Sequence, residues 1–204
     1  MTNIQKARLD ILNCLFYILS PILSFPLIFF SLIKRTKGSA FLFSLFAGYI
    51  SYMYVPPYIY DKARHIEFYN DSKYFTLSEF FAYNFQHQPD FLFRLLIYIG
   101  SVFGIKVHFV FFFITFISIF LIMKVFFDVI KSYNISAKYS TLIVLLSIFS
   151  FSYINIFSGM RYFLALSFLF CGIYYAYIKN IKSYYVYLFL ACITHYSLFF
   201  FIFI

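Results

Sequence analysis

Residues 58–71 read Tyr-Ile-Tyr-Asp-Lys-Ala-Arg-His-Ile-Glu-Phe-Tyr-Asn-Asp, a polar stretch in a chain that is otherwise almost continuously apolar. Of the 204 residues, 64% are hydrophobic and 11% are charged. A soluble domain of this length needs more polar surface than that. The composition therefore predicts an integral membrane protein. It argues against a nucleic-acid-binding protein, although the formal net charge is +9, because the basic residues stand in short clusters between apolar runs.

Uncharged or nearly uncharged runs flank the polar stretch and recur to the end of the chain. A helix that crosses a bilayer needs about 20 apolar residues. The runs of that kind are Ile11–Ile33, Ser39–Tyr60, Val107–Phe127, Tyr139–Met160, Tyr162–Ile178 and Tyr184–Ile204. Pro21 and Pro26 should kink the first run. We predict an all-α, polytopic membrane bundle of about six transmembrane helices, organised as a single transmembrane domain over residues 1–204.

The distribution of charge predicts the orientation of this bundle. Segments 34–37, 124–138 and 179–182 together hold eight basic residues and one acidic residue. Cytoplasmic loops carry an excess of lysine and arginine, so all three segments are expected inside. Segment 61–90 carries five acidic and three basic residues and is expected to form an outer loop.

Two parts of the chain constrain this topology. An even number of crossings must separate the first two basic segments, so Phe91–Ile105 should not cross, and we predict a re-entrant or interfacial helix there. Lys6 and Arg8 do not fit the scheme, because a first span over 11–33 puts them outside. The alternative is that this first segment dips into the membrane and returns to the same side, which its two prolines allow.

Ionisable side chains at membrane depth are costly, so each is a functional candidate. Arg161 lies between two spans near the outer interface, and its guanidinium suits the bidentate binding of phosphate. The alternative is an arginine that reaches to water or to a lipid headgroup. His195, inside the last run, can orient a sugar hydroxyl or accept its proton. The alternative for His195 is a packing role, bonded to a neighbouring helix.

The polar stretch supplies the remaining candidates. Asp61, Arg64 and His65 share a face if the stretch begins with a helical turn, and Asp61 is then either a base or the partner of Arg64. Tyr69 lies near the outer interface, where it either stacks on a sugar ring or belongs to an aromatic belt. His65 has no recognised metal-site spacing to other histidines or acids, so neither a metal nor a cofactor is predicted.

Four fragments resemble the EpsG-like branch of the bacterial Wzy-type polysaccharide polymerases. They occur in the order of that family and cover most of residues 58–200. The fragments are Asp61-Lys-Ala-Arg64-His65, Gln88-Pro-Asp90-Phe91 through Gly104, Asn155 to Ser158-Gly-Met-Arg161-Tyr162-Phe-Leu-Ala165, and Leu190-Ala-Cys-Ile-Thr-His195-Tyr-Ser197. The chain departs from the family pattern at His65, where an aromatic residue is usual, at Tyr162, which replaces glutamine, and at Asp90, which stands for glutamate.

The resemblance implies a multi-pass enzyme of the bacterial inner membrane with a periplasmic active face. Its substrate is oligosaccharide linked to undecaprenyl diphosphate, which it assembles into O-antigen, capsule or exopolysaccharide, and a chain-length regulator protein is an implied partner. Arg161 and Arg64 would hold the diphosphate, and Asp61 or His195 would take a proton. Supporting roles would fall to Asn155, Tyr69 and Arg94.

The resemblance leaves other functions open. Relatives are longer, and the chain ends without a polar exit loop, so we expect a C-terminally truncated protein that can be inactive. A non-catalytic membrane subunit is one alternative. A polysaccharide flippase is another, although its spans would carry polar residues across their depth, whereas here the charges gather at the outer edge.

Overall fold

The computed structural model describes residues 2–58, 60–87, 90–150 and 152–199, and the regular elements within them are all helical. The all-α class is thereby confirmed. The elements are α1 (Asn3–Leu19), α2 (Pro21–Lys34), α3 (Ser39–Met53), α4 (Asp61–Ser72), α5 (Leu77–His87), α6 (Phe91–Val102), α7 (Val107–Ser132), α8 (Ala137–Ser150), α9 (Tyr153–Ser158), α10 (Met160–Tyr174), the π-helix η1 (Tyr175–Lys179) and α11 (Tyr184–Thr194).

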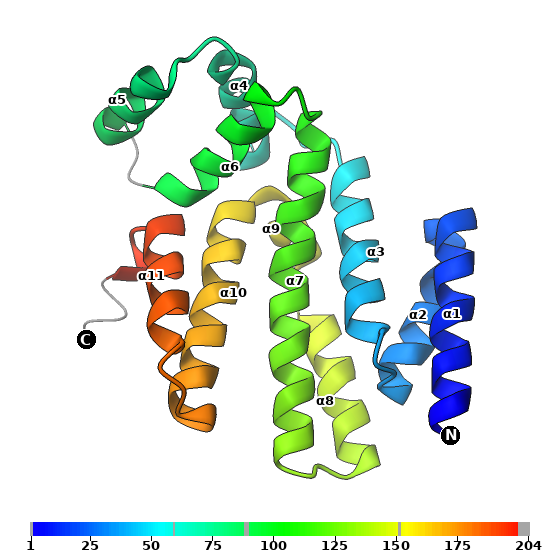
Figure 1. The fold of residues 1–204 in the computed structure, drawn as a ribbon. Coiled ribbons are helices and arrows are strands. Elements are labelled where there is room, and N and C mark those ends of the chain that lie inside the picture. Colours follow the sequence, from blue (N-terminus) through cyan, green and yellow to red (C-terminus); the bar gives the residue numbers. More distant parts are fainter. Residues whose placement is uncertain (1, 59, 88–89, 151, 200–204) are drawn as a thin grey trace.

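The helices form a bundle with a cap over one end (Figure 1). Helix α7 runs through the middle of the bundle and packs against α3 on one side and α10 on the other. Helix α11 packs along α10, and the α1–α2 pair stands at the opposite edge beside α3. Helices α4, α5 and α6 make up the cap, and α4 and α6 pack against each other within it.

Within the part of the chain that the structure describes, two helices are long and apolar enough to cross a membrane, Val107–Ser132 and Met160–Lys179. Five apolar helices in the described residues are shorter, at 10–17 residues: Pro21–Lys34, Ser39–Met53, Phe91–Val102, Lys138–Phe149 and Tyr184–Thr194. The structure therefore has the character of a membrane protein, while the predicted six-span topology stays a prediction.

The first apolar run is two helices, and the single kinked span predicted over 11–33 is wrong. Ser20 has an extended backbone and its hydroxyl accepts the N–H of Leu23 at 3.5 Å, so it caps a new helix in which Pro21 occupies the first position. Proline is tolerated at that position because its missing N–H has no partner there anyway. Helices α1 and α2 pack as a hairpin. The chain thus turns back at Ser20, which is the alternative that the prolines allowed.

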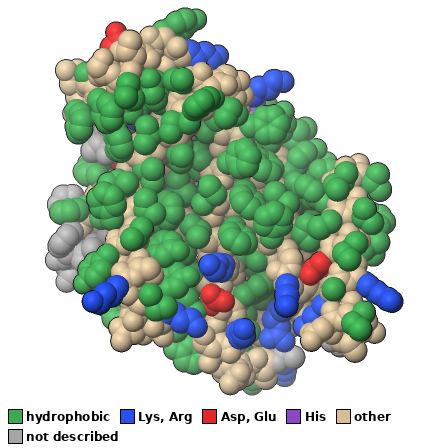
Figure 2. Space-filling view, viewed as in Figure 1, with side chains coloured by type: hydrophobic (Ala, Val, Ile, Leu, Met, Phe, Trp, Pro, Cys, Tyr) green, Lys and Arg blue, Asp and Glu red, His purple; other side chains and the backbone are tan. Residues whose placement is uncertain are grey.

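The hairpin removes the conflict over Lys6 and Arg8. The N-terminus lies at the end of the bundle away from the cap (Figure 1), and Asp10 ties α1 to the turn before α3 by accepting the N–H of Gly38 at 3.1 Å. In the space-filling view, lysine and arginine side chains gather toward this same end, below a broad apolar band (Figure 2). Lys179 joins two of the basic segments, because its Nζ donates to Ser132 Oγ at 3.2 Å.

The turns that follow α2, α7 and η1 all lie at this end, so the three basic segments share one side of the bundle as predicted (Figure 1). Their cytoplasmic location stays a prediction. At the other end, segment 61–90 contains helices α4 and α5, and its placement as an outer loop stays a prediction. Helix α6 lies in the cap beside them and is buried through Phe93 and Ile97.

The side of the membrane on which α6 ends is testable at Lys106. We expect a cysteine at this exposed position to react with a membrane-impermeant maleimide in intact spheroplasts, in a background where the native cysteines are replaced. Lys131→Cys is the matched control, because it lies at the other end of α7, whose 26 residues span about 39 Å at 1.5 Å per residue. This control should react only after permeabilisation. Protection of Lys106→Cys in intact spheroplasts would contradict the non-crossing placement of α6.

Candidate active site

Side chains from α4 and α10, and from the residues that flank α6 and α11, meet where the cap rests on the ends of α10 and α11, and Asp90 is their centre. The Asp90 side chain is 3% exposed. Its Oδ2 accepts a hydrogen bond from Arg161 Nη1, while its Oδ1 accepts from His195 Nδ1 at 3.1 Å and from the backbone N–H of Tyr196 at 2.9 Å. Asp90 stands at the N-cap of α6 but makes no side-chain cap to its own helix. Its carboxylate instead accepts hydrogen bonds from Arg161 in α10 and from the two residues that follow α11.

Arg161 links this centre to the polar stretch, because its Nη2 lies 3.7 Å from Asp61 Oδ2. Local sequence explains both positions. Pro56 and Pro57 end α3, since a residue before proline leaves the helical region, and the chain re-enters a helix at Asp61. A carboxylate in the first turn is favoured by the helix dipole. Gly159 separates α9 from α10, which puts Arg161 in the first turn of α10.

His65 holds Asp61 from the next turn of α4, at 3.1 Å from Nε2 to Oδ2. Burial raises the pKa of Asp61, but the hydrogen bond to His65 and the charges of His65, Arg161 and Arg64 outweigh it and bring the pKa below its usual value. Burial lowers the pKa of His65 in spite of the bond to Asp61. At neutral pH the pair is therefore an ionised carboxylate that accepts a hydrogen bond from a neutral imidazole.

The site has a buried side and an accessible side. Arg161, Asp61 and His195 keep 21%, 28% and 19% of their side chains exposed, in contrast to Asp90. The ring of Tyr162 stands edge-on to the His195 ring at 5.5 Å between centroids. With His195 Nδ1 donating to Asp90, the lone pair of the imidazole is on Nε2. The arrangement can hold an anion at a guanidinium and accept a proton beside it.

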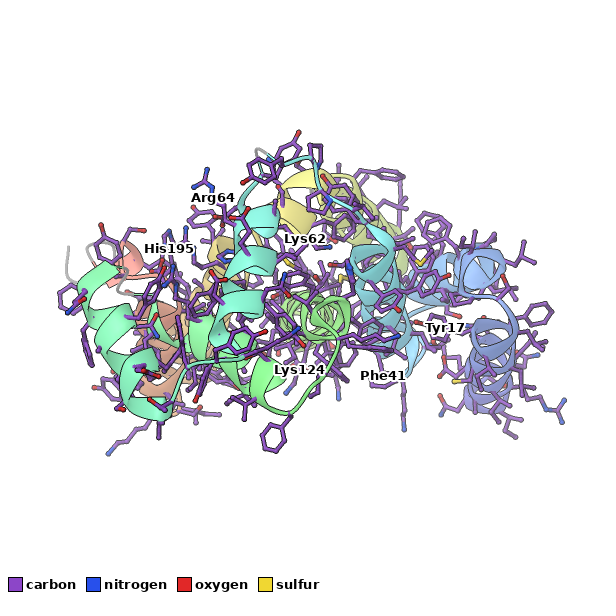
Figure 3. All side chains as sticks on the ribbon, turned by 90° about the horizontal axis from the view of Figure 1, so that it is seen from above. Tyr17, Phe41, Lys62, Arg64, Lys124 and His195 are labelled. Atoms are coloured by element: carbon purple, nitrogen blue, oxygen red, sulfur yellow. The ribbon has the colours of Figure 1, made fainter. Side chains whose placement is uncertain are left out.

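Lys62 fixes α4 to the bundle. Its side chain is fully buried, and its Nζ donates to the carbonyl oxygens of Ser51 at 2.6 Å and Tyr54 at 2.8 Å. These carbonyls belong to the end of α3, where backbone acceptors lack helical partners and the helix dipole is negative. The ring of Phe111 in α7 lies 5.1 Å from the same nitrogen. Viewed from above the cap, Lys62 and Arg64 lie on opposite sides of α4 (Figure 3).

The burial of Lys62 has a measurable consequence. Burial lowers its pKa to about 8, against about 10.4 for an unfolded lysine. Between these values the unfolded chain binds more protons than the folded one, so stability should rise with pH. We expect Lys62→Met to lose this rise. The difference between the Tm of the wild type and the Tm of the variant, measured in detergent, should therefore change in favour of the wild type as the pH increases through this range. Lys73→Met, at the exposed far end of α4, should keep it. Parallel Tm curves for wild type and Lys62→Met would contradict the prediction.

The other candidates from the sequence lie around the centre rather than in it. Arg64 is exposed and points away from the bundle (Figure 3). Arg94 is 7% exposed, lies 4.6 Å over the ring of Phe68, and contacts Asn84 at 3.5 Å. Tyr69 is buried and its hydroxyl donates to the carbonyl of Ile105, which leaves no ring face for a sugar.

Two candidates remain, Asn155 and His195, and the structure changes the expectation for His195. Asn155 is exposed on α9, and the structure uses its backbone carbonyl, which accepts the N–H of Gly159 at 2.7 Å. His195 was expected inside a continuous last helix. Helix α11 instead ends at Thr194, and His195 is extended, with φ −149° and ψ 103°. The bonds from His195 and Tyr196 to Asp90 replace the helical continuation. The last residues of that predicted span, 200–204, lie outside the described residues.

Sequence reasoning noticed Asp90 as one position of a resembling motif and gave it no role. The signal that singles it out is its position, since it is the one acid directly before the apolar Phe91–Ile105 segment. Lys62 was counted as a loop charge. Its partners are backbone carbonyls, which residue patterns do not report.

Fold and site together define a class: a helical membrane protein that gathers an arginine, two carboxylates and a histidine at one end of its bundle. The chain belongs to the EpsG family, whose model matches residues 61–204. This match confirms the resemblance seen in the sequence motifs. A search of curated proteins and a search of solved structures gave no match. Membership of the EpsG family suggests a polysaccharide polymerase-like, glycosyltransferase-type function.

Proposed function

We propose that this protein is a polysaccharide polymerase of the bacterial inner membrane, with its active site on the outer face. It would transfer an oligosaccharide from one undecaprenyl diphosphate carrier to the sugar of a second carrier, building O-antigen, capsule or exopolysaccharide. The observation that carries the proposal is the placement of Arg161 between Asp61 and Asp90, beside His195. Membership of the EpsG family supports the same reaction class.

Arg161 is the group best suited to the diphosphate. The Asp61 contact, at 3.7 Å, is looser than the hydrogen bond to Asp90, so a phosphate can replace Asp61 at Nη2 while Asp90 keeps hold of Nη1. Charge-assisted bonds to a guanidinium are roughly twice as strong as neutral ones. Fixed cations contribute most where charge develops in the transition state, which here is the leaving diphosphate. Arg64 points away from the bundle but is close enough to Asp61 to lower the pKa of that carboxylate, so it would offer a second cation to the exposed side of the headgroup.

His195 is the better of the two candidate bases. In the reaction, the acceptor hydroxyl oxygen bonds to the anomeric carbon of the donor sugar, and the bond from that carbon to the diphosphate oxygen breaks. The hydroxyl proton would pass to His195 Nε2, while Asp90 keeps the ring oriented through Nδ1. Asp61 has a lowered pKa and is a correspondingly weak base. Its role would be to hold Arg161 in place before the substrate arrives.

Complementation of a strain that lacks its polymerase tests the proposal. The full chain should restore a ladder of glycans of increasing length, read on gels of extracted surface polysaccharide. Single-repeat glycans in the presence of normally inserted protein would overturn the polymerase and leave a non-catalytic subunit or an inactive fragment. Lipid-linked repeat units that accumulate inside the cell would instead indicate a flippase.

A further inference from the structure

An apolar groove of about 520 Å³ opens between α2, α3, α8 and α9. Phe25 and Phe29 of α2, Phe149 of α8 and Phe157 of α9 contribute rings to its walls, and Ala47 of α3 leaves space between them. The Phe29 and Phe149 rings meet across the groove at 6.5 Å between centroids. Four different helices thus build one hydrocarbon-lined space.

The groove offers little to a polar ligand. Tyr153, on α9, carries the one hydroxyl among the side chains that line it, and this hydroxyl donates to the carbonyl of Ile148 at 2.9 Å. The ring of Tyr153 therefore faces the groove while its polar atom is already satisfied. Burying an unpaired polar group here would be unfavourable, because the group would lose its hydrogen bonds to water without gaining new ones. The occupant that fits is a hydrocarbon.

The volume of the groove fits a lipid hydrocarbon chain better than a neighbouring α-helix. A cavity of about 150 Å³ holds one benzene molecule, so the 520 Å³ of this groove corresponds to roughly 20 carbon atoms on that scale. A helix about 10 Å wide with a pitch of 5.4 Å fills roughly 420 Å³ per turn. The groove would therefore admit little more than one turn of a neighbouring helix, but a substantial length of a lipid chain.

The groove lies close to the charged site in the chain and in space. Helix α9 carries Phe157 in the groove wall and ends three residues before Arg161. The Phe157 ring lies 6.1 Å from the ring of Tyr54, whose carbonyl accepts from Lys62. The neighbour of Lys62 in the chain, Asp61, lies 3.7 Å from Arg161. Because Phe157 and Arg161 are only four residues apart, a lipid in the groove could place its headgroup near the arginine.

We propose that the groove between α2, α3, α8 and α9 holds the hydrocarbon chain of the lipid whose phosphate headgroup binds at Arg161. This inference rests on the proposed function, and it adds where the carrier lies and which helices select it. The first 60 residues, outside the segment that matches the EpsG family, acquire a role through it, because α2 and α3 form half of the groove. Arg161 and the groove would then act as two ends of one lipid-binding site.

Photo-crosslinking tests the placement. The full chain is reconstituted in nanodiscs of phosphatidylethanolamine and phosphatidylglycerol, with a polyprenyl diphosphate that carries a photoreactive group near the free end of its chain. We expect crosslinked peptides from α2, α3 and α8. Excess unlabelled polyprenyl diphosphate should remove them, and an equal excess of phosphatidylglycerol should not.

Variants sharpen the test. Ala47→Trp fills the groove and should reduce the competed crosslink roughly tenfold, which is 1.4 kcal/mol in binding. Phe149→Gln puts a polar group at a position that is 74% exposed, and it should reduce the crosslink without disturbing the fold. Ile117→Trp, at a 38% exposed position of α7 away from the groove, is the matched control and should leave the crosslink unchanged.

Three outcomes would overturn the groove assignment: equal competition by phosphatidylglycerol, equal loss in Ile117→Trp, or crosslinks that map to the hollow of about 490 Å³ between α10 and α11, which Tyr162 and Leu188 line. The proposed function fails separately. A glycan ladder without groove crosslinks would support the polymerase function and refute the assignment of the groove to the lipid chain. A groove crosslink that is lost on competition, in a protein that makes no ladder, would support lipid binding in the groove and refute the polymerase function.

Discussion

Replacing Arg161 by lysine is expected to abolish glycan chain extension while the protein still accumulates in the membrane. The guanidinium reaches Asp90 through Nη1 and approaches Asp61 through Nη2. A lysine ammonium is a compact point charge that neutralises Asp90 but cannot also present a planar fork to a diphosphate. Removing one such transition-state contact typically costs about 10²- to 10³-fold in rate. A loss of that size should shift the ladder to single repeats in the complementation assay.

Arg8→Lys is the control for this experiment, because Arg8 is exposed in the first half of α1, and the N-terminus lies at the end of the bundle away from the cap. It should leave the ladder unchanged. Membrane fractions probed by immunoblot should hold equal amounts of wild type and both variants. Normal chain lengths from Arg161→Lys would remove the diphosphate role assigned to Arg161.

Asp90→Asn should lose both polymer and stability. The buried carboxylate accepts from Arg161, from His195 and from the N–H of Tyr196, and an asparagine has only one oxygen to offer them. Breaking a buried charge pair by removing one partner typically costs 3–5 kcal/mol. We therefore expect a lower Tm in detergent, together with single-repeat glycans, because His195 also loses its orientation.

Two further variants separate the role of the charge from general damage. Asp90→Glu keeps the carboxylate, matches the residue usual in the family that the sequence resembles, and should recover part of the ladder. Asp71→Asn removes an exposed acid at the end of α4 and should change neither the ladder nor the Tm. If Asp90→Asn retains both a long ladder and the wild-type Tm, Asp90 is not the centre of the site.

Composition alone was enough to predict the helical membrane class, since apolar runs of this length have few other uses. Charge counting also grouped the three basic segments correctly at one end. The α1–α2 hairpin could not be predicted in this way, because the sequence allowed both a single kinked helix and a segment that turns back. A proline that kinks a helix and a proline that starts a new one look alike in sequence, and the choice at Pro21 follows from the Ser20 cap and from packing.

The site was predicted in part, through those of its members that stand out as charges in apolar surroundings. Arg161, Asp61 and His195 do lie together. Their arrangement depends on Asp90, which is 71 residues from Arg161 and 105 residues from His195 along the chain. Helical periodicity reports only near neighbours, so it carries no information on such a pairing. The end of α11 at Thr194 was missed for the same reason, because tertiary bonds terminate that helix.

The span of these pairings bears on how the protein is made. Asp90 leaves the ribosome 71 residues ahead of Arg161 and 106 residues ahead of Tyr196. Until Arg161 is made the carboxylate has neither partner, and until Tyr196 is made it lacks the backbone N–H; an uncompensated charge at membrane depth is costly. We therefore expect the cap to stay hydrated during insertion and to close over α10 and α11 after residues up to Tyr196 have been made. The site would therefore be assembled late in synthesis. A chain that ends before His195 would lack two of the partners of Asp90, His195 and Tyr196, and its cap would stay open.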